Sequence, residues 1–287
     1  TATVLLGTLY PLLIDALGLG KMSVGAPYFN SVFIPLMVPL LMLIGFGQTA
    51  HWRRDSFKRL FSIAKYPAAC AITLAIGAWA MLEGTGAIQA ALALLMAFWV
   101  IVTTLKNLYL QLSNATKISP VRRALLGQSV AHIGFAVTVI GVTLVSIYSV
   151  EKHVRMSPGE SIEFSNYQAT FDSIKKITGP NYSGVEATFN VTQDEKVIAV
   201  LFPQKRNYNA GSQTMTEAGI SAGITKDIYI ALGEKIDTED WGVRLNIKPF
   251  VRWIWFGAFL MAAGGMIAAS DLRFKRLNKN RRPSAQT

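Results

Sequence analysis

Long apolar runs, separated by short polar or basic stretches, fill most of the first 150 residues and return near the end of the sequence. A membrane-spanning helix needs about 20 consecutive apolar residues, and most of these runs come close to that length. They predict six spans, at about 1–16, 31–50, 67–83, 88–105, 125–149 and 249–270. The first is too short to be complete. We therefore expect a truncated first span and a chain that is the C-terminal part of a longer or split protein.

The segment 150–248 has a different pattern, in which apolar and polar residues alternate over short runs. Such alternation, rich in β-branched and aromatic residues, is typical of half-buried strands. The runs are Ser161–Phe164, Val185–Val191, Lys196–Phe202, Asp227–Leu232 and Val243–Ile247. The sequence thus predicts an α-helical polytopic membrane protein with a small β-rich domain before its last span. The expected parts are a helical bundle (1–149), the β-rich domain (150–248) and a last helix with a basic tail (249–287).

Composition and charge support this interpretation. The chain is 51% hydrophobic and only 16% charged, with a mean hydropathy of +0.34, whereas soluble chains carry about 25% charged residues. Its formal net charge is +11, which by itself would also suit a nucleic-acid-binding protein. The basic residues, however, gather in three clusters beside the spans: Arg53, Arg54, Lys58, Arg59 and Lys65; Lys106, Lys117, Arg122 and Arg123; and six Lys or Arg between 273 and 282.

Strict alternation of six spans places all three basic clusters on one side of the membrane, as the positive-inside rule expects of cytoplasmic loops. The charge therefore reports topology, and we set nucleic-acid binding aside. The C-terminus is expected in the cytoplasm and the 150–248 segment on the outer side. The single cysteine, Cys70, permits neither a disulfide within the chain nor a cysteine-based metal site.

His132 is the most informative residue, because it lies inside the apolar run that predicts the fifth span. An ionisable ring in hydrocarbon is a candidate functional site by default. If the helix begins near Leu125, His132 lies roughly 10 Å along it. A stripe of small residues, Gly134, Thr138 and Gly141, follows, where a helix or a flat group can approach closely. The alternative is a neutral imidazole that hydrogen-bonds a neighbouring helix.

Haem is a group that would suit these surroundings. A haem placed edge-down would present its propionates to Arg122 and Arg123 and to Arg53 and Arg54, while His132 reached the iron. The arginines have an alternative role in topology and in binding lipid headgroups. The other histidines are weaker candidates: His51 is expected at headgroup level beside Trp52, and His153 lies just beyond the fifth span.

Several stretches of the chain resemble a known family. They are Gly7–Leu12, Lys21–Asn30, Ala131–Gly134, Pro203–Tyr208, Met215–Ile220 and Asp227–Glu234. Together they resemble the C-terminal part of the CcmF family, the large membrane subunit of the bacterial cytochrome c haem lyase. The resemblance implies a chain of the bacterial inner membrane whose 150–248 domain is periplasmic.

The resemblance also implies an activity and partners. The family attaches haem, received from the chaperone CcmE, to the CxxCH cysteines of apocytochrome c. It also holds a b-type haem between two membrane histidines, of which the second matches His132. The implied partners are the N-terminal part of the same subunit, CcmE, apocytochrome-presenting subunits of the CcmH and CcmI type, apocytochrome c and membrane lipid. The outer loop carrying Lys21 and Tyr28 is expected either to line a groove for the delivered haem or to form an interfacial turn.

One departure from the family pattern limits these expectations. The tryptophan-rich WWD loop, its flanking histidines and the first membrane haem histidine have no counterpart in this sequence, and Trp253 and Trp255 suit an aromatic belt better. We therefore expect the chain to supply one ligand of a shared haem and to be inactive alone. Two other classes stay open: a transporter or export subunit that uses His132 as a proton or ligand contact, and a scaffold whose β domain recruits partners.

Overall fold

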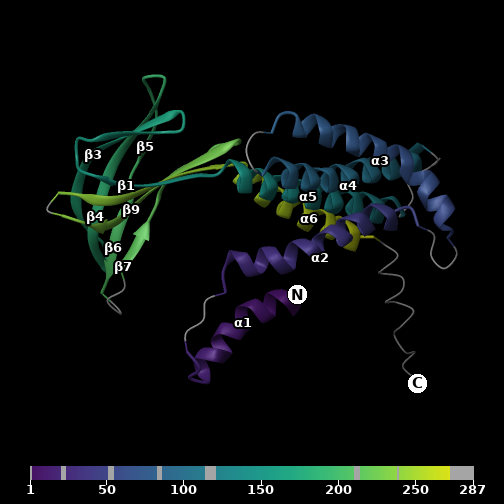
Figure 1. Ribbon diagram of the computed structural model, residues 1–287, viewed down its shortest axis with the longest axis horizontal. Helices are drawn as coiled ribbons and strands as arrows, with labels where there is room; N and C mark the ends of the chain where they lie inside the picture. Colours follow the sequence, from purple (N-terminus) through teal and green to yellow (C-terminus); the bar gives the residue numbers. More distant parts are fainter. Residues whose placement is uncertain are drawn as a thin grey trace, which may run out of the picture. The chain divides into compact units, whose positions relative to one another are not determined.

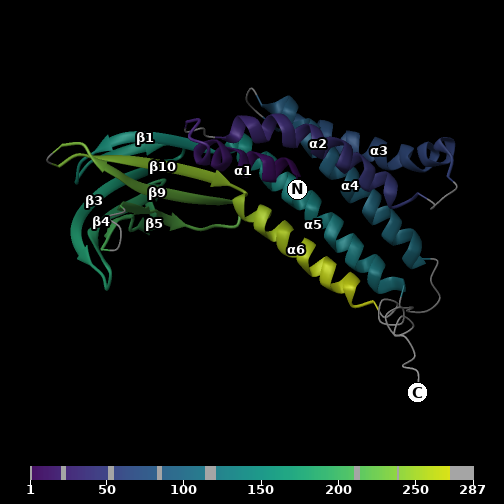
Figure 2. The same cartoon turned by 90° about the horizontal axis from the view of Figure 1, so that it is seen from below.

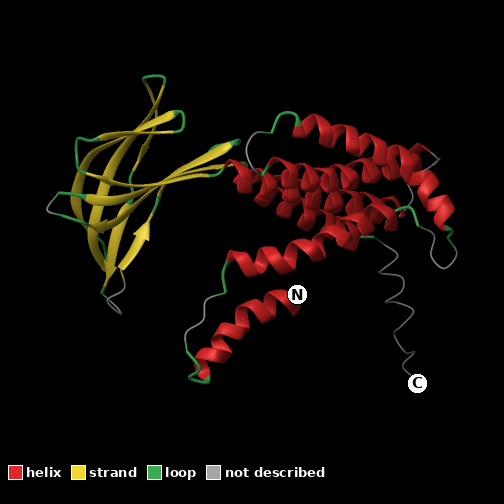
Figure 3. Ribbon diagram, viewed as in Figure 1, coloured by secondary structure: helices red, strands yellow, loops and turns green. Residues whose placement is uncertain are grey.

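A computed structural model of the chain describes residues 2–20, 24–50, 55–82, 86–113, 121–209, 214–237 and 239–271. By contact density the chain divides into two compact units, Thr1–Val137 with Gly257–Thr287, and Thr138–Phe256. The helices are α1 (Ala2–Ala16), α2 (Ala26–Gly47), α3 (Phe57–Trp79), α4 (Ala87–Ser113), α5 (Val121–Tyr148) and α6 (Val251–Ala269), drawn in red in Figure 3.

Between α5 and α6 the described residues form ten strands (Figure 1). They are β1 (Val150–Met156), β2 (Ser161–Phe164), β3 (Tyr167–Thr178), β4 (Tyr182–Gln193), β5 (Lys196–Leu201), β6 (Gln204–Tyr208), β7 (Thr214–Glu217), β8 (Gly219–Ser221), β9 (Lys226–Lys235) and β10 (Trp241–Pro249). The predicted class, a helical membrane protein with a β domain before the last helix, is confirmed. Each of the five predicted strand runs corresponds to an observed strand.

Six helices stand at the places of the six predicted spans, but fewer qualify as spans. Among the described residues four helical segments are long and apolar enough to cross a membrane: Phe57–Trp79, Ala87–Ser113, Arg123–Tyr148 and Val251–Ala269. The apolar segments Val4–Ala16 and Ile34–Gly47 of α1 and α2 are shorter. The count of candidate spans in the described part of the chain is therefore four, where the sequence predicted six.

Helix α3 begins ten residues before the predicted span, because basic sequence in front of Pro67 is itself helical. Ser56 caps this start by accepting a hydrogen bond from the Arg59 N–H at 3.3 Å. Within the helix, Pro67 has no N–H, so the Ile63 carbonyl loses its usual partner. The ammonium group of Lys106 in α4 donates to that carbonyl at 2.8 Å. Lys106 thus repairs a proline break as well as carrying charge.

Small residues let the helices of the first unit approach closely. Ala64, Ala71 and Ala75 are the buried alanines of α3. On α2, Gly45 makes room for the Trp99 indole of α4, since a Cβ at Gly45 would lie 2.1 Å from the indole nitrogen. That nitrogen donates to the Met42 carbonyl at 3.2 Å. Many large apolar side chains of these helices are instead exposed, as expected for surfaces that face lipid.

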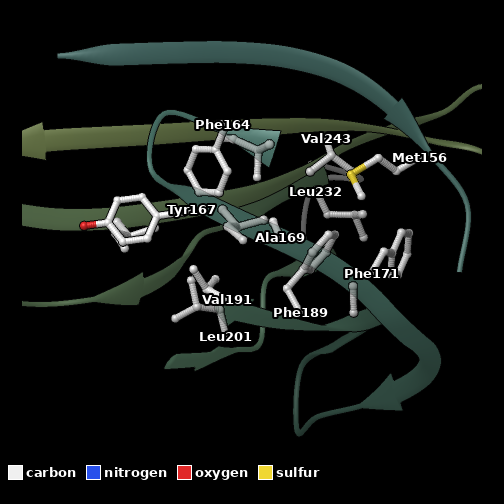
Figure 4. Close-up of a cluster of buried hydrophobic side chains, with 14 of the residues drawn as sticks. Met156, Phe164, Tyr167, Ala169, Phe171, Phe189, Val191, Leu201, Leu232 and Val243 are labelled. Atoms are coloured by element: carbon white, nitrogen blue, oxygen red, sulfur yellow. The ribbon is translucent and has the colours of Figure 1, made fainter. Parts of the chain in front are cut away.

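The β domain is a sandwich of two antiparallel sheets. One sheet has the strand order β1-β10-β9-β8, and the other has β2-β3-β4-β6-β7, with β5 also paired to β4. Their facing sides enclose an apolar core drawn from both sheets. Figure 4 shows its side chains, among them Phe171 of β3 and Phe189 of β4, whose rings stack with centroids 4.6 Å apart.

Candidate functional site

His132 lies on α5, eleven residues after the first residue of the helix. At 1.5 Å per residue this is about 16 Å along the axis. The distance exceeds the predicted value because α5 begins at Val121 rather than near Leu125. The imidazole is partly buried. His132 still lies in the first half of α5, the half that begins with the basic residues Arg122 and Arg123.

The small-residue stripe of α5 contacts a helix. Added Cβ atoms at Gly127, Gly134 and Gly141 would all lie within 3 Å of α6 atoms. At Gly134, for example, a Cβ would meet the Gly257 carbonyl oxygen at 2.7 Å. Of the two occupants that the sequence allowed beside His132, a helix or a flat group, the structure shows the helix. Any planar group bound by His132 has to use another side of α5.

The two nitrogens of the His132 ring have different surroundings. Nδ1 is enclosed and has no hydrogen-bond partner among the described residues, whereas Nε2 is not among the enclosed atoms that lack a partner. The hydroxyl oxygen of Thr104 on α4 is likewise enclosed and has no hydrogen-bond partner among the described residues. The structure therefore gives no support to the alternative in which a described neighbouring helix already satisfies the imidazole.

Most of the predicted basic site residues cannot be placed. Lys21, Arg53 and Arg54 lie outside the described residues, as does His51. Arg122 is placed only as a backbone position in the first turn of α5. Arg123 follows it with an exposed side chain. The predicted grouping of arginines around a haem edge therefore stays a prediction.

Tyr28 was expected in a loop, but it lies on a helix. Helix α2 begins at Ala26, with Pro27 in its first turn, a position that proline favours. The Tyr28 ring is partly buried and meets the Phe29 ring edge-on at 5.3 Å. A Cβ at Gly7 of α1 would lie 2.6 Å from the Tyr28 ring. Tyr28 thus packs between the first two helices.

Sequence analysis overlooked Asp271, a fully buried carboxylate just after α6. Its Oδ2 accepts a hydrogen bond from the Ala124 backbone N–H at 3.2 Å. The first N–H groups of a helix have no partner within it, and a carboxylate there is stabilising. Asp271 therefore joins the end of α6 to the start of α5. An acidic residue that follows an apolar run was the available signal.

A second overlooked carboxylate, Asp227 on β9, is buried in the other unit. It accepts hydrogen bonds from the Gly223 N–H at 2.9 Å, the Tyr229 hydroxyl at 3.3 Å and the Arg252 guanidinium at 3.1 Å. Burial, reinforced by the Asp227 charge, raises the pKa of the Tyr229 phenol. Because Arg252 is in the first turn of α6, Asp227 connects the sandwich to the head of that helix.

Other candidate residues show ordinary surroundings. His153 on β1 is exposed and lies 2.9 Å from the Glu151 carboxylate, in a surface pair. Cys70 on α3 is exposed and free. No group of three or more His, Cys, Asp or Glu that could hold a metal ion occurs in the described part of the chain. Of the placed histidines, only His132 combines a membrane helix with an enclosed, unpartnered nitrogen.

The fold and the site define a class of protein, a polytopic membrane protein with a β-sandwich inserted before its last helix and a histidine in the preceding one. Residues 147–249 match the family model described as "CcmF C-terminal beta-sandwich". The cytochrome c-type biogenesis protein CcmF of Escherichia coli K12 is 41% identical over 273 residues, or 95% of this chain. The CcmF of Pseudomonas aeruginosa is 41% identical over 282 residues, or 97% of this chain.

A solved structure agrees with these matches. A chain titled "Cytochrome c Heme Lyase CcmF" superposes with a TM-score of 0.71 over 94% of this chain, at 22% identity, which supports the fold. The resemblance to the C-terminal part of the CcmF family is thus confirmed. The chain spans only 42% and 43% of the length of the two curated relatives and 43% of the solved chain.

Proposed function

We propose that the chain is part of a cytochrome c haem lyase and supplies His132 as an axial ligand of a b-type haem within the membrane. The observation that carries this proposal is the state of the imidazole. Its Nδ1 is enclosed and has no partner among the described residues, and a histidine that ligates metal through one ring nitrogen commonly donates a hydrogen bond from the other. Neutral imidazole is a common axial ligand of haem iron.

The residues of this chain fit a shared haem rather than a complete haem site. No second described histidine lies in a candidate span, and the proposed source of the other axial ligand is the family's N-terminal part or another chain. Helix α6 covers the glycine side of α5. A haem can therefore approach the imidazole only on the side of α5 that carries His132. When bound, the haem would supply an electron for reducing incoming haem iron. This chain's part is to hold and orient its iron ligand.

The basic residues around the start of α5 are proposed to hold the propionates. Asp271 already accepts the Ala124 N–H at the head of this helix. Binding of another anion there therefore falls to the side chains of Arg122 and Arg123, together with Arg53 and Arg54, by charge-assisted hydrogen bonds. On the opposite side, Lys21 and Tyr28 are proposed to lie on the surface that receives haem from CcmE.

The proposed topology follows the basic clusters. The C-terminus is cytoplasmic, and the β domain over 150–248 is periplasmic, where haem would be joined to the CxxCH cysteines of apocytochrome c. The proposed partners are the family's N-terminal part, CcmE, and subunits of the CcmH and CcmI type. The charge of the loops supports this orientation, and the resemblance to CcmF supports the partners.

The test is a comparison of two single-histidine variants in the complete lyase. His132→Ala should lose membrane haem and mature cytochrome c while the polypeptide remains at its normal level. His153→Ala, which removes an exposed imidazole from the sandwich, is the matched control and should retain both. Undiminished membrane haem in His132→Ala would refute the proposal and favour a transporter or a scaffold.

A further inference from the structure

Among the described residues of the helical unit, Thr1–Val137 with Gly257–Thr287, two enclosed polar side-chain atoms have no hydrogen-bond partner, and they lie on the consecutive helices α4 and α5. One is the His132 Nδ1 and the other is the hydroxyl oxygen of Thr104, a residue with no exposed surface. The adjacent Thr103 behaves as threonine usually does in a helix, since its hydroxyl donates to the Trp99 carbonyl at 2.6 Å. A buried polar group left without a partner costs about 1–3 kcal/mol. The exception at Thr104 therefore needs a reason.

Thr104 lies on the side of α4 that faces away from α2 and α3. Trp99 and Lys106 mark the other side, because they donate to carbonyls of α2 and α3. With 3.6 residues per turn, the buried positions Ala90, Leu94, Ala97 and Thr104 form a separate stripe nearly opposite to them. Their burial requires that another helix cover this stripe.

His132 lies on the side of α5 that faces away from α6. The glycines that contact α6 recur at intervals of seven residues on one side of α5. The buried positions Leu125, Ser129, Ala136 and Thr143 recur on the opposite side, and helical periodicity places His132 among them. Helix α4 lies alongside α5 in both Figure 1 and Figure 2. The Thr104 stripe of α4 is therefore the candidate counterpart of the His132 stripe of α5.

Counted from the consecutive helix ends Ser113 and Val121, the two residues have similar positions along their own helices. Thr104 is nine residues before Ser113, the end of α4, and His132 is eleven residues after Val121, the start of α5. At 1.5 Å per residue these separations are about 14 Å and 16 Å. The difference is about half a helical turn, which the side chains can bridge.

We propose that Thr104 is the positioning residue for His132. The structure does not contain a hydrogen bond between the two side chains, since both atoms lack a partner among the described residues; in the complete lyase the Thr104 hydroxyl oxygen would accept one from the Nδ1–H of the imidazole. The inference rests on the proposed function and deepens it. The bond would fix the tautomer in which Nε2 carries the lone pair for iron, and would increase the basicity of that nitrogen. The threonine O–H would donate in turn to a carbonyl of its own helix.

The hydrogen bond is tested with two variants of Thr104 in the complete lyase. Thr104→Val keeps the branched shape and removes the hydroxyl, whereas Thr104→Ser keeps the hydroxyl. We expect Thr104→Val to weaken haem retention about tenfold and to raise the midpoint potential of the membrane haem, because a less basic imidazole stabilises ferric iron less. Thr104→Ser should keep the haem retention and the midpoint potential of the wild type. A merely structural threonine would not shift the potential in this pattern.

Proximity is tested separately, without haem. In a Cys70→Ser background, the pair Thr104→Cys with His132→Cys should form a disulfide on mild oxidation, because bridged Cα atoms lie within about 7 Å. The control pair Leu94→Cys with His132→Cys is displaced by ten residues along α4, about 15 Å, and should not. Failure of the first pair to cross-link, or cross-linking of both pairs alike, would overturn the inference.

The outcomes separate the two proposals. If membrane haem depends on His132 but Thr104→Val has the wild-type potential and haem content, the positioning role is wrong and the proposed function stands. If His132→Ala keeps its haem, the proposed function and the positioning role are both wrong. Loss of haem in His132→Ala, together with a raised potential in Thr104→Val that Thr104→Ser reverses, supports both.

Discussion

The two kinds of structure in this chain bury different amino acids. In the β-sandwich, Phe171, Phe189 and Leu245 have no exposed surface, whereas the enclosed apolar residues of the helices include alanines such as Ala97 and Ala136. Large apolar side chains on the helices, such as Phe259 of α6, are mostly exposed. Water drives the large side chains of the sandwich into a core. Lipid does not, so the helices associate through close packing of small residues and interhelical hydrogen bonds.

This contrast predicts its largest effect in the sandwich core. Phe171→Ala should destabilise the folded sandwich by about 3–5 kcal/mol, because it leaves a cavity beside Phe189. Phe259→Ala on the exposed surface of α6 should change stability by less than about 0.5 kcal/mol. Denaturant unfolding of the purified chain in detergent, followed by circular dichroism and limited proteolysis, measures both. Equal losses would contradict the difference between the two regions.

Two adjacent glycines test the small-residue contacts of the helices. A Cβ at Gly264 would lie 2.5 Å from the Ala131 backbone nitrogen and from the Gly127 carbonyl oxygen, whereas a Cβ at Gly265 would meet nothing within 4 Å. Gly264→Ala should therefore destabilise the helical unit by about 1–3 kcal/mol. Gly265→Ala should be neutral or slightly stabilising, since alanine favours helix. Thermal unfolding in detergent compares them, and equal melting temperatures would show that the α5–α6 contact tolerates separation.

Lys106 tests whether polar repair matters in the helices. Lys106→Met leaves the Ile63 carbonyl without the donor that compensates for Pro67, which should destabilise the helical unit by about 1–2 kcal/mol. Adding Pro67→Ala restores the backbone N–H within α3 and should recover most of that loss. Resistance of the helices to denaturant in a double-mutant cycle measures the coupling. Additive effects of the two substitutions would refute this account.

The smallest effect is a pH dependence confined to the sandwich. Hydrogen bonds from Ser157 and from Arg155 hold the pKa of the Asp240 carboxyl below its ordinary value. This carboxylate contributes stability above its unfolded pKa of about 3.9, and the contribution is lost as the pH falls through the lower folded pKa. Thermal melts between pH 5 and 3 measure this loss, and Asp240→Asn should make the stability of the sandwich depend less steeply on pH in that range. Glu195→Gln in the exposed β4–β5 turn is the control, and a slope unchanged by Asp240→Asn would refute the assignment.

The sequence predicted the existence of each helix better than its ends. Apolar length reveals a span because lipid admits few alternatives. The early start of α3 depends on the Ser56 cap and on a proline kept inside a helix, which hydropathy does not report. In the sandwich, β3 escaped prediction because an irregularity between Phe171 and Ser173 shifts its register and breaks the alternation. The five predicted runs are short stretches rich in apolar and β-branched residues.

The candidate site was predicted in part. His132 was found because a lone imidazole in an apolar run is conspicuous. The face that it occupies was not found, since the glycines beside it proved to contact α6. The sequence did not indicate a role for Thr104, because the hydroxyl of a threonine in a span normally donates a hydrogen bond to a carbonyl of its own helix. Asp271 and Asp227 acquire their roles from residues more than 20 positions away along the chain, which local patterns cannot show.

The central claim is that His132 binds iron. Its most direct test is the reduced-minus-oxidised absorption spectrum of the purified complex, recorded for the wild type, for His132→Ala and for His132→Ala supplied with imidazole. We predict sharp b-type bands in the wild type, their loss in the variant and their return with imidazole. Unchanged bands in His132→Ala without imidazole would contradict the claim.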